Sequence, residues 1–491
     1  MSEALSTVAK GADAESLLLA RRIQSERHQH WSSIYAARRV HLVGVGGCGM
    51  SGLAGVLLRC GAIVSGSDLK PSGVFPRLEE MGATIRIGQA PINVPTDCDY
   101  VVYSAAVKED NPELLEARRR GLRCLKYAEM LGQVMRHRTG IAISGTHGKS
   151  TTTALTAYML RRAKADPTFV VGAESVQLGG GSGVGDGPHF VVEACEYDRS
   201  FLNLSPKWAA ILNIEEDHLD CYRDLDAITQ AFRAFGCLVP EDGLIVANGE
   251  DPAVRRATAG LRAAVETFGL GESAYWRAVN IDHELGCYRF DILRDGEPFL
   301  RANLRCLPGW HQVFNSLAAT AMAAHAGINP DCIAESLATF SGAQRRLMKR
   351  GEASGILFLD DYGHHPTEIQ FTLRAVREHY PHRRLWVIFQ PHQHSRTRFL
   401  LEDFARSFGR ADFLLVPDIY FVRDSEAERG RICSSNLVDR VRANGGNALY
   451  LPTPAEIADH VLSHVQEGDI VLTIGAGDVW KIGDELVRRL G

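Results

Sequence analysis

The amino-acid sequence predicts an α/β protein of three domains. Apolar, strand-like runs lead into glycine turns and then into helix-forming segments at Gly44–Gly49 and again at Gly145–Lys149. A third series of strand-like runs, each ending in polar or glycine residues, begins near Gly355. The 491 residues also exceed what one hydrophobic core usually supports, about 250–300 residues. Ligands of open α/β sheets bind at the carboxyl ends of the strands, so we expect the functional residues there.

Composition and charge limit the kinds of function that the protein can have. The chain is 45% hydrophobic and 23% charged and contains 47 glycines, which is typical of a turn-rich α/β enzyme. A net charge of -5 gives no electrostatic reason to expect a nucleic-acid partner. No apolar run approaches the roughly 20 residues that span a bilayer, and the charged leader at 1–37, helical or disordered, does not resemble a signal peptide. We therefore expect a cytoplasmic protein without membrane insertion, either a monomer or a homodimer.

The first unit, expected over 38–138, opens as strand, glycine turn and helix, with a second strand over Ala62–Asp68. Its turn reads Gly44-x-Gly46-x-x-Gly49. Taken alone, this pattern predicts dinucleotide binding, because glycines let the backbone approach a diphosphate while Asp68 bonds a ribose hydroxyl. Any diphosphate-linked nucleoside meets the same requirement, so NAD is not implied. Close packing of strand against helix is the alternative without a ligand.

The second unit, expected over 139–343, contains the clearest motif of the chain. Residues 140–155 read GIAISGTHGKSTTTAL, an apolar strand followed by a turn and a helix. Backbone N–H groups of the turn and the positive end of the helix favour anionic phosphates. Lys149 adds a charge near the terminal phosphates of a nucleoside triphosphate, and the Ser150 hydroxyl can ligate Mg²⁺. The usual GxxxxGK[ST] spacing is not met, since Ile143 occupies the first glycine position.

Acidic and imidazole groups follow this turn in the chain. Glu193 closes the strand-like run His189–Cys195, and His218 follows the run Trp208–Ile214, so two strand ends can deliver a carboxylate and an imidazole beside the phosphates. A packed or capping histidine is the alternative for His218. Several nearby acids read instead as solvated loop residues: Glu196, Asp198, Glu215, Glu216 and Asp217. We further expect a flexible glycine-rich loop over Leu178–Pro188 and antiparallel strands over about 275–307.

The third unit, expected over 344–491, carries clusters of arginine and histidine. Arg396 and Arg398 follow an apolar strand, where guanidinium groups suit phosphates and carboxylates. Arg345 and Arg346 can instead be an exposed linker pair, and His364 and His365 can simply cap the helix that begins near Pro366. The eleven cysteines contain no CxxC pair and indicate neither a zinc site nor a disulfide framework.

The ordered set of motifs resembles the ATP-dependent Mur ligases, and within them the alanine-adding branch. The segments that carry the resemblance are VGVGGCGMSGLAGVLL, GTHGKSTTT, EACEYDRSFL, NIEEDHLD, PGWHQVFNSLAA, GAQRRL, DDYGHHPTEI, QPHQHSRTR and LTIGAGDVW. The resemblance implies a Rossmann-like UDP-binding domain, a central P-loop ATPase-type domain and a Rossmann-like C-terminal lid that binds the amino acid. It also implies ligation of L-alanine to UDP-N-acetylmuramate through an acyl phosphate, in peptidoglycan synthesis, with ATP and Mg²⁺.

The resemblance further implies roles for individual residues. Catalysis falls to Lys149, His218, Arg346 and His364, and the metal ligands are Ser150, Glu193 and His218. Tyr362, His364 and Arg396 bind the amino acid or close over the reacting groups. ATP is bound by Gly145, Thr146, His147, Gly148, Lys149, Ser150, Thr151, His311 and Asn315, and the UDP-sugar by Gly44, Gly46, Gly47, Gly49, Ser67, Asp68 and Ser104.

Some positions depart from the family pattern. Ser150 stands where a threonine is usual, Cys195 replaces an acid, and Gln393 stands where an arginine usually helps hold substrate. Trp310 and Gln312 change the expected adenine contacts. Several relatives carry a carbamylated lysine that helps hold a second Mg²⁺, but no lysine occurs between Lys207 and Lys349, which favours the alanine-adding branch.

Three alternatives remain open on the sequence. A recycling ligase that joins UDP-N-acetylmuramate to a preformed tripeptide shares the glycine turns and the ATP loop. A nicotinamide-dependent dehydrogenase explains the turn at Gly44–Gly49 and Asp68 but leaves Lys149, Glu193 and His218 without a role. A non-catalytic nucleotide-binding regulator keeps the phosphate turn but has no use for the arginines and histidines of the third unit.

Overall fold

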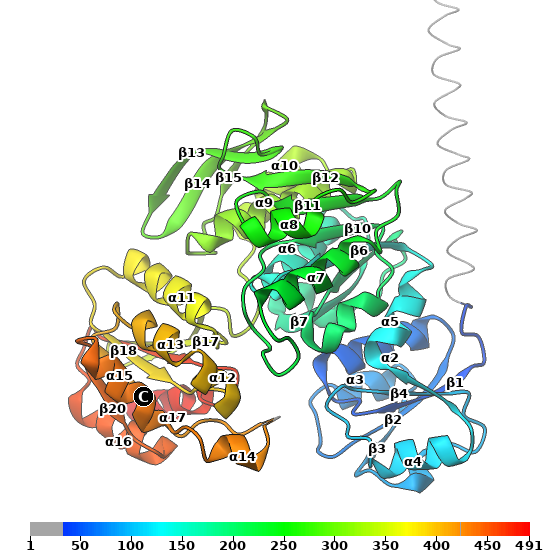
Figure 1. The fold of residues 1–491 in the computed structure, drawn as a ribbon, viewed down its shortest axis with the longest axis horizontal. Coiled ribbons are helices and arrows are strands. Elements are labelled where there is room, and N and C mark those ends of the chain that lie inside the picture. The colour runs from blue at the N-terminus through cyan, green and yellow to red at the C-terminus, as the bar shows by residue number, and fades with distance from the viewer. Residues whose placement is uncertain (1–32, 423) are drawn as a thin grey trace, which may run out of the picture.

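The computed structural model describes residues 33–491 except residue 423, so the predicted leader at 1–37 lies almost wholly outside the described residues. Three sheets of five, ten and six strands follow one another along the chain, which confirms the predicted α/β class. In Figure 1 the N-terminal domain (blue) and the C-terminal domain (orange and red) both adjoin the central domain (green).

The N-terminal sheet is wholly parallel, in the order β3-β2-β1-β4-β5. The strand predicted over Ala62–Asp68 is present as β2. The elements are β1 (Arg39–Val43), α2 (Cys48–Arg59), β2 (Ile63–Asp68), α3 (Phe75–Glu80), β3 (Thr84–Ile87), η1 (Pro91–Asn93), β4 (Tyr100–Tyr103), α4 (Pro112–Arg119), β5 (Arg123–Lys126) and α5 (Tyr127–Met135).

The central sheet has the order β15-β14-β13-β12-β11-β10-β6-β9-β7-β8. Its middle strands are parallel, whereas β13, β14 and β15 are antiparallel, as the alternating sequence over 275–307 predicts. Its elements are β6 (Thr139–Ser144), α6 (Lys149–Arg162), β7 (Thr168–Ser175), η2 (Val176–Leu178), β8 (Gly180–Gly183), β9 (His189–Glu193), η3 (Tyr197–Asn203), β10 (Trp208–Ile211), α7 (Leu225–Gly236), β11 (Leu244–Asn248), α8 (Pro252–Thr258), β12 (Ala264–Gly269), β13 (Trp276–Glu284), β14 (Cys287–Arg294), β15 (Glu297–Asn303), α9 (His311–His325) and α10 (Pro330–Thr339).

The glycine-rich segment 178–188 is not a loop throughout, and the prediction of a flexible loop there was wrong. Gly180–Gly183 form β8, which pairs antiparallel with β7 at the sheet edge and packs against α2 of the N-terminal domain. A Cβ at Gly181 would lie 2.8 Å from Cys48 Sγ, and one at Gly52 would lie 2.8 Å from Ser182 Cβ. The glycines therefore serve the close approach of two domains, a use that composition alone does not distinguish from flexibility.

The C-terminal sheet has the order β16-β17-β21-β18-β19-β20, parallel except for β16. Its elements are β16 (Met348–Ala353), β17 (Ile356–Asp361), α11 (Pro366–His379), β18 (Leu385–Phe389), α12 (His394–Phe399), α13 (Leu401–Ser407), β19 (Phe413–Val416), α14 (Glu426–Arg429), α15 (Ser434–Ala443), β20 (Ala448–Tyr450), α16 (Pro454–His464), β21 (Ile470–Ile474) and α17 (Trp480–Leu490). Helix α11 (yellow in Figure 1) faces the central domain.

Several helices begin at a capping side chain followed by proline. The Asn111 and Asp251 side chains accept hydrogen bonds from the first turns of α4 and α8, and Thr453 caps α16 in the same way. Proline suits the next position, because the backbone N–H that proline lacks would have no hydrogen-bond acceptor within the helix there. His365 caps α11 by this arrangement, since its ring accepts a hydrogen bond from Thr367 N. The helix-cap interpretation of His365 is therefore confirmed, although the ring makes further contacts described below.

The junction between the central and C-terminal domains is anchored on both sides of one peptide bond. Gln344 N donates to Glu174 O of the central domain at 2.7 Å. Arg345 belongs to the C-terminal domain, because its guanidinium donates to Asp360 Oδ2 at 2.9 Å and to the carbonyls of Gly475 and Gly477. Arg345 is thus not an exposed linker residue, and its φ of 58° lies in the left-handed region.

No helix within residues 33–491 is long and apolar enough to cross a membrane. All eleven cysteines lie among the described residues, and each is a free thiol.

Candidate functional site

The second glycine turn connects β6 to α6 at the edge of the central sheet where the parallel strands end. Gly148 is the N-cap of α6 with φ of 82°, a conformation that favours glycine, and a Cβ there would lie 2.5 Å from Asn315 Oδ1. His147 N donates to Asn213 Oδ1 at 2.7 Å, so the loop after β10 holds the turn from one side. The turn therefore leads from a strand into a helix as the sequence predicts, and phosphate binding there stays a prediction.

Lys149 is half-buried beside the turn. Its Nζ donates to Gly145 O at 2.6 Å, to Thr146 O at 3.0 Å and to Glu196 Oε1 at 2.9 Å. Burial alone would lower the pKa of Lys149, but the carboxylate of Glu196 raises it above the ordinary value, so the amine is charged. A fixed positive charge therefore lies at the end of the strand where the turn begins.

Glu196 is the carboxylate that joins Lys149 to His218. It is 2% exposed, and His218 Nε2 lies 3.5 Å from its Oε1. The prediction that Glu196 is a solvated loop acid was wrong, because its carboxylate pairs with the Lys149 amine at 2.9 Å, and the Tyr222 hydroxyl donates to Glu196 O at 2.5 Å. Asp198 and Glu216 are exposed, as predicted.

Glu193 ends β9, as expected from the sequence, and its side chain faces β7. Its Oε2 accepts a hydrogen bond from Gly172 N at 2.7 Å. A Cβ at Gly172 would lie 2.6 Å from Glu193 Oε2, so glycine is needed to admit the carboxylate. The structure thus brings Lys149, Glu196 and His218 together, with Glu193 on the neighbouring strand, and the assignment of Glu193 as metal ligand remains a prediction.

The C-terminal domain contacts this region through an arginine. Arg396 on α12 contacts Asp217 Oδ1 with Nε and with its terminal nitrogen, both at 3.0 Å, and each side chain is less than 10% exposed. Burial would raise the pKa of Asp217, but Arg396 holds it well below its usual range. Asp217 is therefore a buried ion-paired acid, and its interpretation as a solvated loop residue was wrong.

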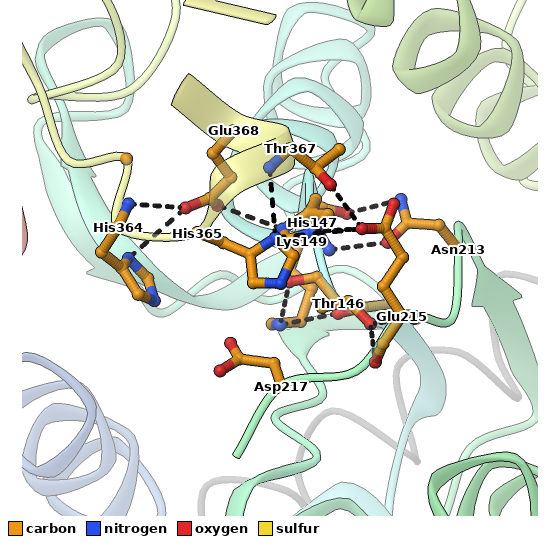
Figure 2. Close-up of polar contacts among 12 residues, drawn as sticks. Thr146, His147, Lys149, Asn213, Glu215, Asp217, His364, His365, Thr367 and Glu368 are labelled. Atoms are coloured by element: carbon orange, nitrogen blue, oxygen red, sulfur yellow. Dashed lines mark hydrogen bonds and ion pairs between the residues drawn. The ribbon is translucent and has the colours of Figure 1, made fainter. Parts of the chain in front are cut away.

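A second group of contacts surrounds His147 (Figure 2). His147 Nε2 lies 3.4 Å from Glu215 Oε2, and His147 Nδ1 lies 3.4 Å from Glu368 Oε1 on α11. Burial opposes the charge, but the two carboxylates raise the pKa of His147 to about 9. The ring of His365 lies 4.7 Å from that of His147, and Thr367 Oγ1 donates to Glu215 Oε2 at 2.6 Å. These contacts join the phosphate turn to the C-terminal domain.

Arg346, Tyr362 and His364 lie beside this group. The Arg346 guanidinium lies 5.3 Å from the centre of the Tyr362 ring and 3.5 Å from Glu368 Oε1. His364 Nδ1 lies 3.4 Å from Glu368 Oε2, yet burial lowers the pKa of His364 to about 4, so its imidazole is neutral near pH 7. These three predicted residues therefore lie together around Glu368, which the sequence analysis did not single out.

A cavity of about 650 Å³ opens next to the phosphate turn and extends between the central and C-terminal domains. His311 and Asn315, predicted to lie near adenine and ribose, both line it, as do His147, Gly148 and Thr151 of the turn. The His311 ring stacks on Phe371 at 5.3 Å, its Nδ1 is buried without a partner, and burial lowers its pKa to about 4. Apolar walls and a few polar atoms are typical of a site for a nucleoside.

The first glycine turn lies between β1 and α2. Gly44 has φ of 83°, and Gly46 N donates to Asp68 Oδ2 at 2.9 Å. A Cβ at Gly46 would lie 2.9 Å from Asp68 Oδ2, and one at Gly49 would lie 2.9 Å from the Tyr127 hydroxyl oxygen. Gly47, in contrast, is exposed and meets no atom nearer than 3.6 Å. Close packing thus accounts for Gly46 and Gly49, whereas Gly47 faces open space.

The other predicted UDP-sugar residues occupy different surroundings. Ser67 is fully buried and donates to Glu113 Oε2 at 2.6 Å, while His41 Nε2 lies 3.0 Å from the same oxygen. Ser104 Oγ accepts a hydrogen bond from Ala106 N at 3.3 Å. Glu113 is fully buried and fixes Ser67 beside Asp68, a supporting role that the sequence analysis missed because nothing in the helix sequence PELLEARR marks one acid as internal.

The other site residues that the sequence did not predict were missed for one shared reason. Asp217 pairs with Arg396 and Glu368 pairs with His147 across a domain boundary, so spacing along the chain gives no sign of these two contacts. The one available signal was position, since Glu196 and Asp217 follow strand ends at the sheet edge where ligands bind.

The fold and the site define a class: a three-domain α/β nucleotide-binding protein whose phosphate turn is covered by its C-terminal domain. Three family models match in sequence order, described as the Mur ligase family catalytic domain over residues 39–139, the Mur ligase middle domain over 143–323 and the Mur ligase glutamate ligase domain over 345–477. The chain belongs to the Mur ligase family, which confirms the resemblance found in the sequence.

Individual relatives agree with this placement. A UDP-N-acetylmuramate–L-alanine ligase of Caldanaerobacter subterraneus is 40% identical over 92% of this chain and 98% of its own length. One of Salinibacter ruber is 42% identical over 92% of this chain and 95% of its own length. Among solved structures, the UDP-N-acetylmuramate-alanine ligase MurC of Thermotoga maritima matches with a TM-score of 0.76 at 27% identity, over 92% of this chain and 98% of that one. A murein peptide ligase of Psychrobacter arcticus matches with a TM-score of 0.70 at 26% identity, over 93% and 99%.

Proposed function

We propose that this protein uses ATP to join L-alanine to UDP-N-acetylmuramate, giving UDP-N-acetylmuramoyl-L-alanine, ADP and phosphate. One observation carries the proposal: the phosphate turn, to which the charged Lys149 is bonded, borders a nucleoside-sized cavity that residues of the C-terminal domain also line. The curated relatives of about 40% identity that cover this chain are named as ligases of this kind. They favour alanine as the amino acid.

The reaction requires activation of a carboxylate. The lactyl carboxylate of UDP-N-acetylmuramate has a poor leaving group, so phosphoryl transfer from ATP first gives an acyl phosphate and ADP. The alanine amine then attacks the acyl carbon, and the tetrahedral intermediate collapses with loss of inorganic phosphate. Lys149, held by Glu196 and two turn carbonyls, supplies positive charge where the transferred phosphoryl group passes.

The residues present fit a magnesium ion. Ser150 is buried at the second position of α6, and the carboxylates of Glu193 and Glu196 and the His218 imidazole belong to the same sheet edge. Oxygen donors are what Mg²⁺ prefers, and His218 is the less usual ligand. When bound, Mg²⁺ neutralises charge on the phosphates. Ser150, Glu193 and His218 would hold it.

The C-terminal domain excludes water and binds the amino acid. Water in the site would hydrolyse the acyl phosphate, so closure protects it. Arg396 offers a guanidinium for the alanine carboxylate, and to do so it must share its contact with Asp217. Tyr362, stacked under Arg346, and the neutral His364 complete the wall on this side.

A phosphate-release assay tests the proposal. The enzyme receives ATP, Mg²⁺ and UDP-N-acetylmuramate together with L-alanine, glycine, L-serine or the tripeptide L-Ala-γ-D-Glu-diaminopimelate. We expect release with L-alanine and at least tenfold less with the tripeptide. Release with the tripeptide alone would assign a recycling ligase instead, and an NADH absorbance change without phosphate release would assign a dehydrogenase.

A further inference from the structure

The contacts around His147 contain three metal-ligand atoms that face one another. One ligand atom from each of His147, Glu215 and His365 lies within 4.8 Å of the other two. His147 Nε2 and Glu215 Oε2 are 3.4 Å apart, and His365 Nδ1 and Glu215 Oε2 are 3.8 Å apart. Two ligands at about 2.0–2.1 Å from a tetrahedral zinc ion lie roughly 3.4 Å from each other. Small side-chain shifts therefore bring all three within reach of one ion.

Each of these three side chains also has a second polar contact, apart from the atoms that face one another. His147 Nδ1 faces Glu368 Oε1 at 3.4 Å, and His365 Nε2 bonds the Glu216 carbonyl at 3.0 Å. Glu215 accepts a hydrogen bond from Thr367 Oγ1 at 2.6 Å. Metal-binding histidines in proteins usually bond a carboxylate or a carbonyl through the second ring nitrogen, which fixes ring orientation and tautomer. Both histidines here have such partners.

One ligand atom also lacks any hydrogen-bond partner. His147 is 7% exposed, and its Nε2, which is buried and directed toward Glu215, makes no hydrogen bond. His365 is 5% exposed, and its Nδ1 accepts only the long 3.3 Å capping bond from Thr367 N. Two imidazoles and one carboxylate, with Glu368 behind them, favour a borderline-soft divalent cation over Mg²⁺.

We propose that His147, Glu215 and His365 form a binding site for a divalent transition metal such as Zn²⁺. The site is separate from the predicted magnesium ligands Ser150, Glu193 and His218, and it uses no cysteine. The metal takes the place of the proton shared between His147 and its carboxylates. Because His147 lies on the phosphate turn, Glu215 on the loop after β10 and His365 at the start of α11, the bound metal fastens the C-terminal domain to the phosphate turn.

Calorimetric titration of the full-length protein with Zn²⁺ tests the site without any turnover. We expect one equivalent of Zn²⁺ per chain. His365→Asn keeps a capping side chain at the start of α11 but removes the imidazole, and Glu215→Gln keeps an acceptor for Thr367 but removes the charge. Each should weaken Zn²⁺ binding roughly 100-fold or more, and the melting temperature reports whether each variant folds.

The matched control lies on α16, where His460 and His464 stack at 4.3 Å and can bind metal adventitiously. The double variant His460→Gln/His464→Gln should still bind one equivalent of Zn²⁺ with high affinity. The proposal is overturned if Zn²⁺ binding is lost in this control but kept in His365→Asn and Glu215→Gln. It is also overturned if the wild-type protein does not bind one equivalent of Zn²⁺.

A second measurement tests the link between domains. Small-angle scattering of the wild-type protein should show a smaller radius of gyration with Zn²⁺ than with Mg²⁺, and His365→Asn should show no difference between the two ions. Zn²⁺ should also slow turnover reversibly, because the lid must open to release products, and a chelator should restore the rate. An unchanged radius in the wild type at saturating Zn²⁺ would contradict the bridging arrangement. The binding and scattering experiments do not depend on the proposed ligase reaction. The proposed metal site and the proposed function can therefore fail separately.

Discussion

The two glycine turns of this protein share a backbone plan but differ in chemistry. Each joins a parallel strand to a helix, and each has a backbone N–H bonded to a side chain at or just beyond the end of a neighbouring strand: Gly46 N to Asp68 and His147 N to Asn213. The first turn continues into Cys48 and Gly49 and carries no cation. The second continues into Lys149 and Ser150, and acids and histidines from two domains surround it.

If the proposed function is right, both turns bind an anion, and the residues that follow each turn decide what happens to it. We propose that a diphosphate lies against the first turn unchanged. At the second turn, the fixed charge of Lys149 and the covering domain would allow a phosphoryl group to be transferred. The predictions below separate the two turns.

The largest effect is expected for Lys149→Ala. Loss of this charge should lower kcat at least 1000-fold, a cost of several kcal/mol in transition-state stabilisation, while UDP-N-acetylmuramate binding stays within threefold of wild type. Turnover is measured by phosphate release and binding by calorimetry. Activity within tenfold of wild type would refute the role of the second turn.

Gly47→Val should act on the first turn alone. Gly47 has extended backbone angles and open space around its Cβ position, so valine is accommodated and extends over the face where a diphosphate would lie. We expect UDP-N-acetylmuramate binding to weaken about 100-fold, with ATP binding and melting temperature unchanged. Gly46→Val is the comparison variant, because its Cβ contacts Asp68 and it should lose both binding and stability. Unaltered UDP-sugar binding in Gly47→Val, or tight NAD binding by the wild type, would remove the first turn from the substrate site.

Glu193→Gln and Glu196→Gln distinguish two carboxylates that lie three positions apart. Glu193→Gln should raise the Mg²⁺ concentration for half-maximal rate about tenfold, because a ligand charge is lost. Glu196→Gln should mainly lower kcat at saturating Mg²⁺, since it releases the Lys149 amine from its contact. The measurement is turnover over a range of Mg²⁺ concentrations, and the opposite ranking would make Glu196 the ligand.

The last prediction concerns the pH dependence of stability rather than turnover. The pKa of His147 is raised to about 9, above its ordinary value near 6.5, so its contribution to stability is complete below about pH 6.5 and is lost as pH rises through about 9. Wild-type protein should lose roughly 3 kcal/mol more stability between pH 6.5 and 9.5 than His147→Gln, measured by denaturant unfolding. Equal losses would show that the carboxylates do not hold a proton on His147.

Local patterns predicted much of this molecule. The strand-turn-helix order at both glycine turns, the antiparallel strands over 275–307 and the class of each domain follow from periodicity and turn residues. The hairpin at Gly180–Gly183 was not predictable, because its partner α2 lies in another domain. The buried state of Glu196 and Asp217 also escaped prediction, since a loop acid is buried only when a distant cation such as Lys149 or Arg396 meets it.

The anchored peptide bond between Gln344 and Arg345 bears on how the C-terminal domain, as the proposed lid, would close over the cavity. A lid on a long flexible linker would sample a large volume, and its effective concentration over the cavity would fall as the linker lengthened. Here Gln344 is fixed to the central domain and Arg345 to the C-terminal domain, so a rotation of the C-terminal domain as the proposed lid would be confined to very few backbone bonds. Such a rotation would lose little chain entropy on closing, so the contacts that hold the closed state could each be weak.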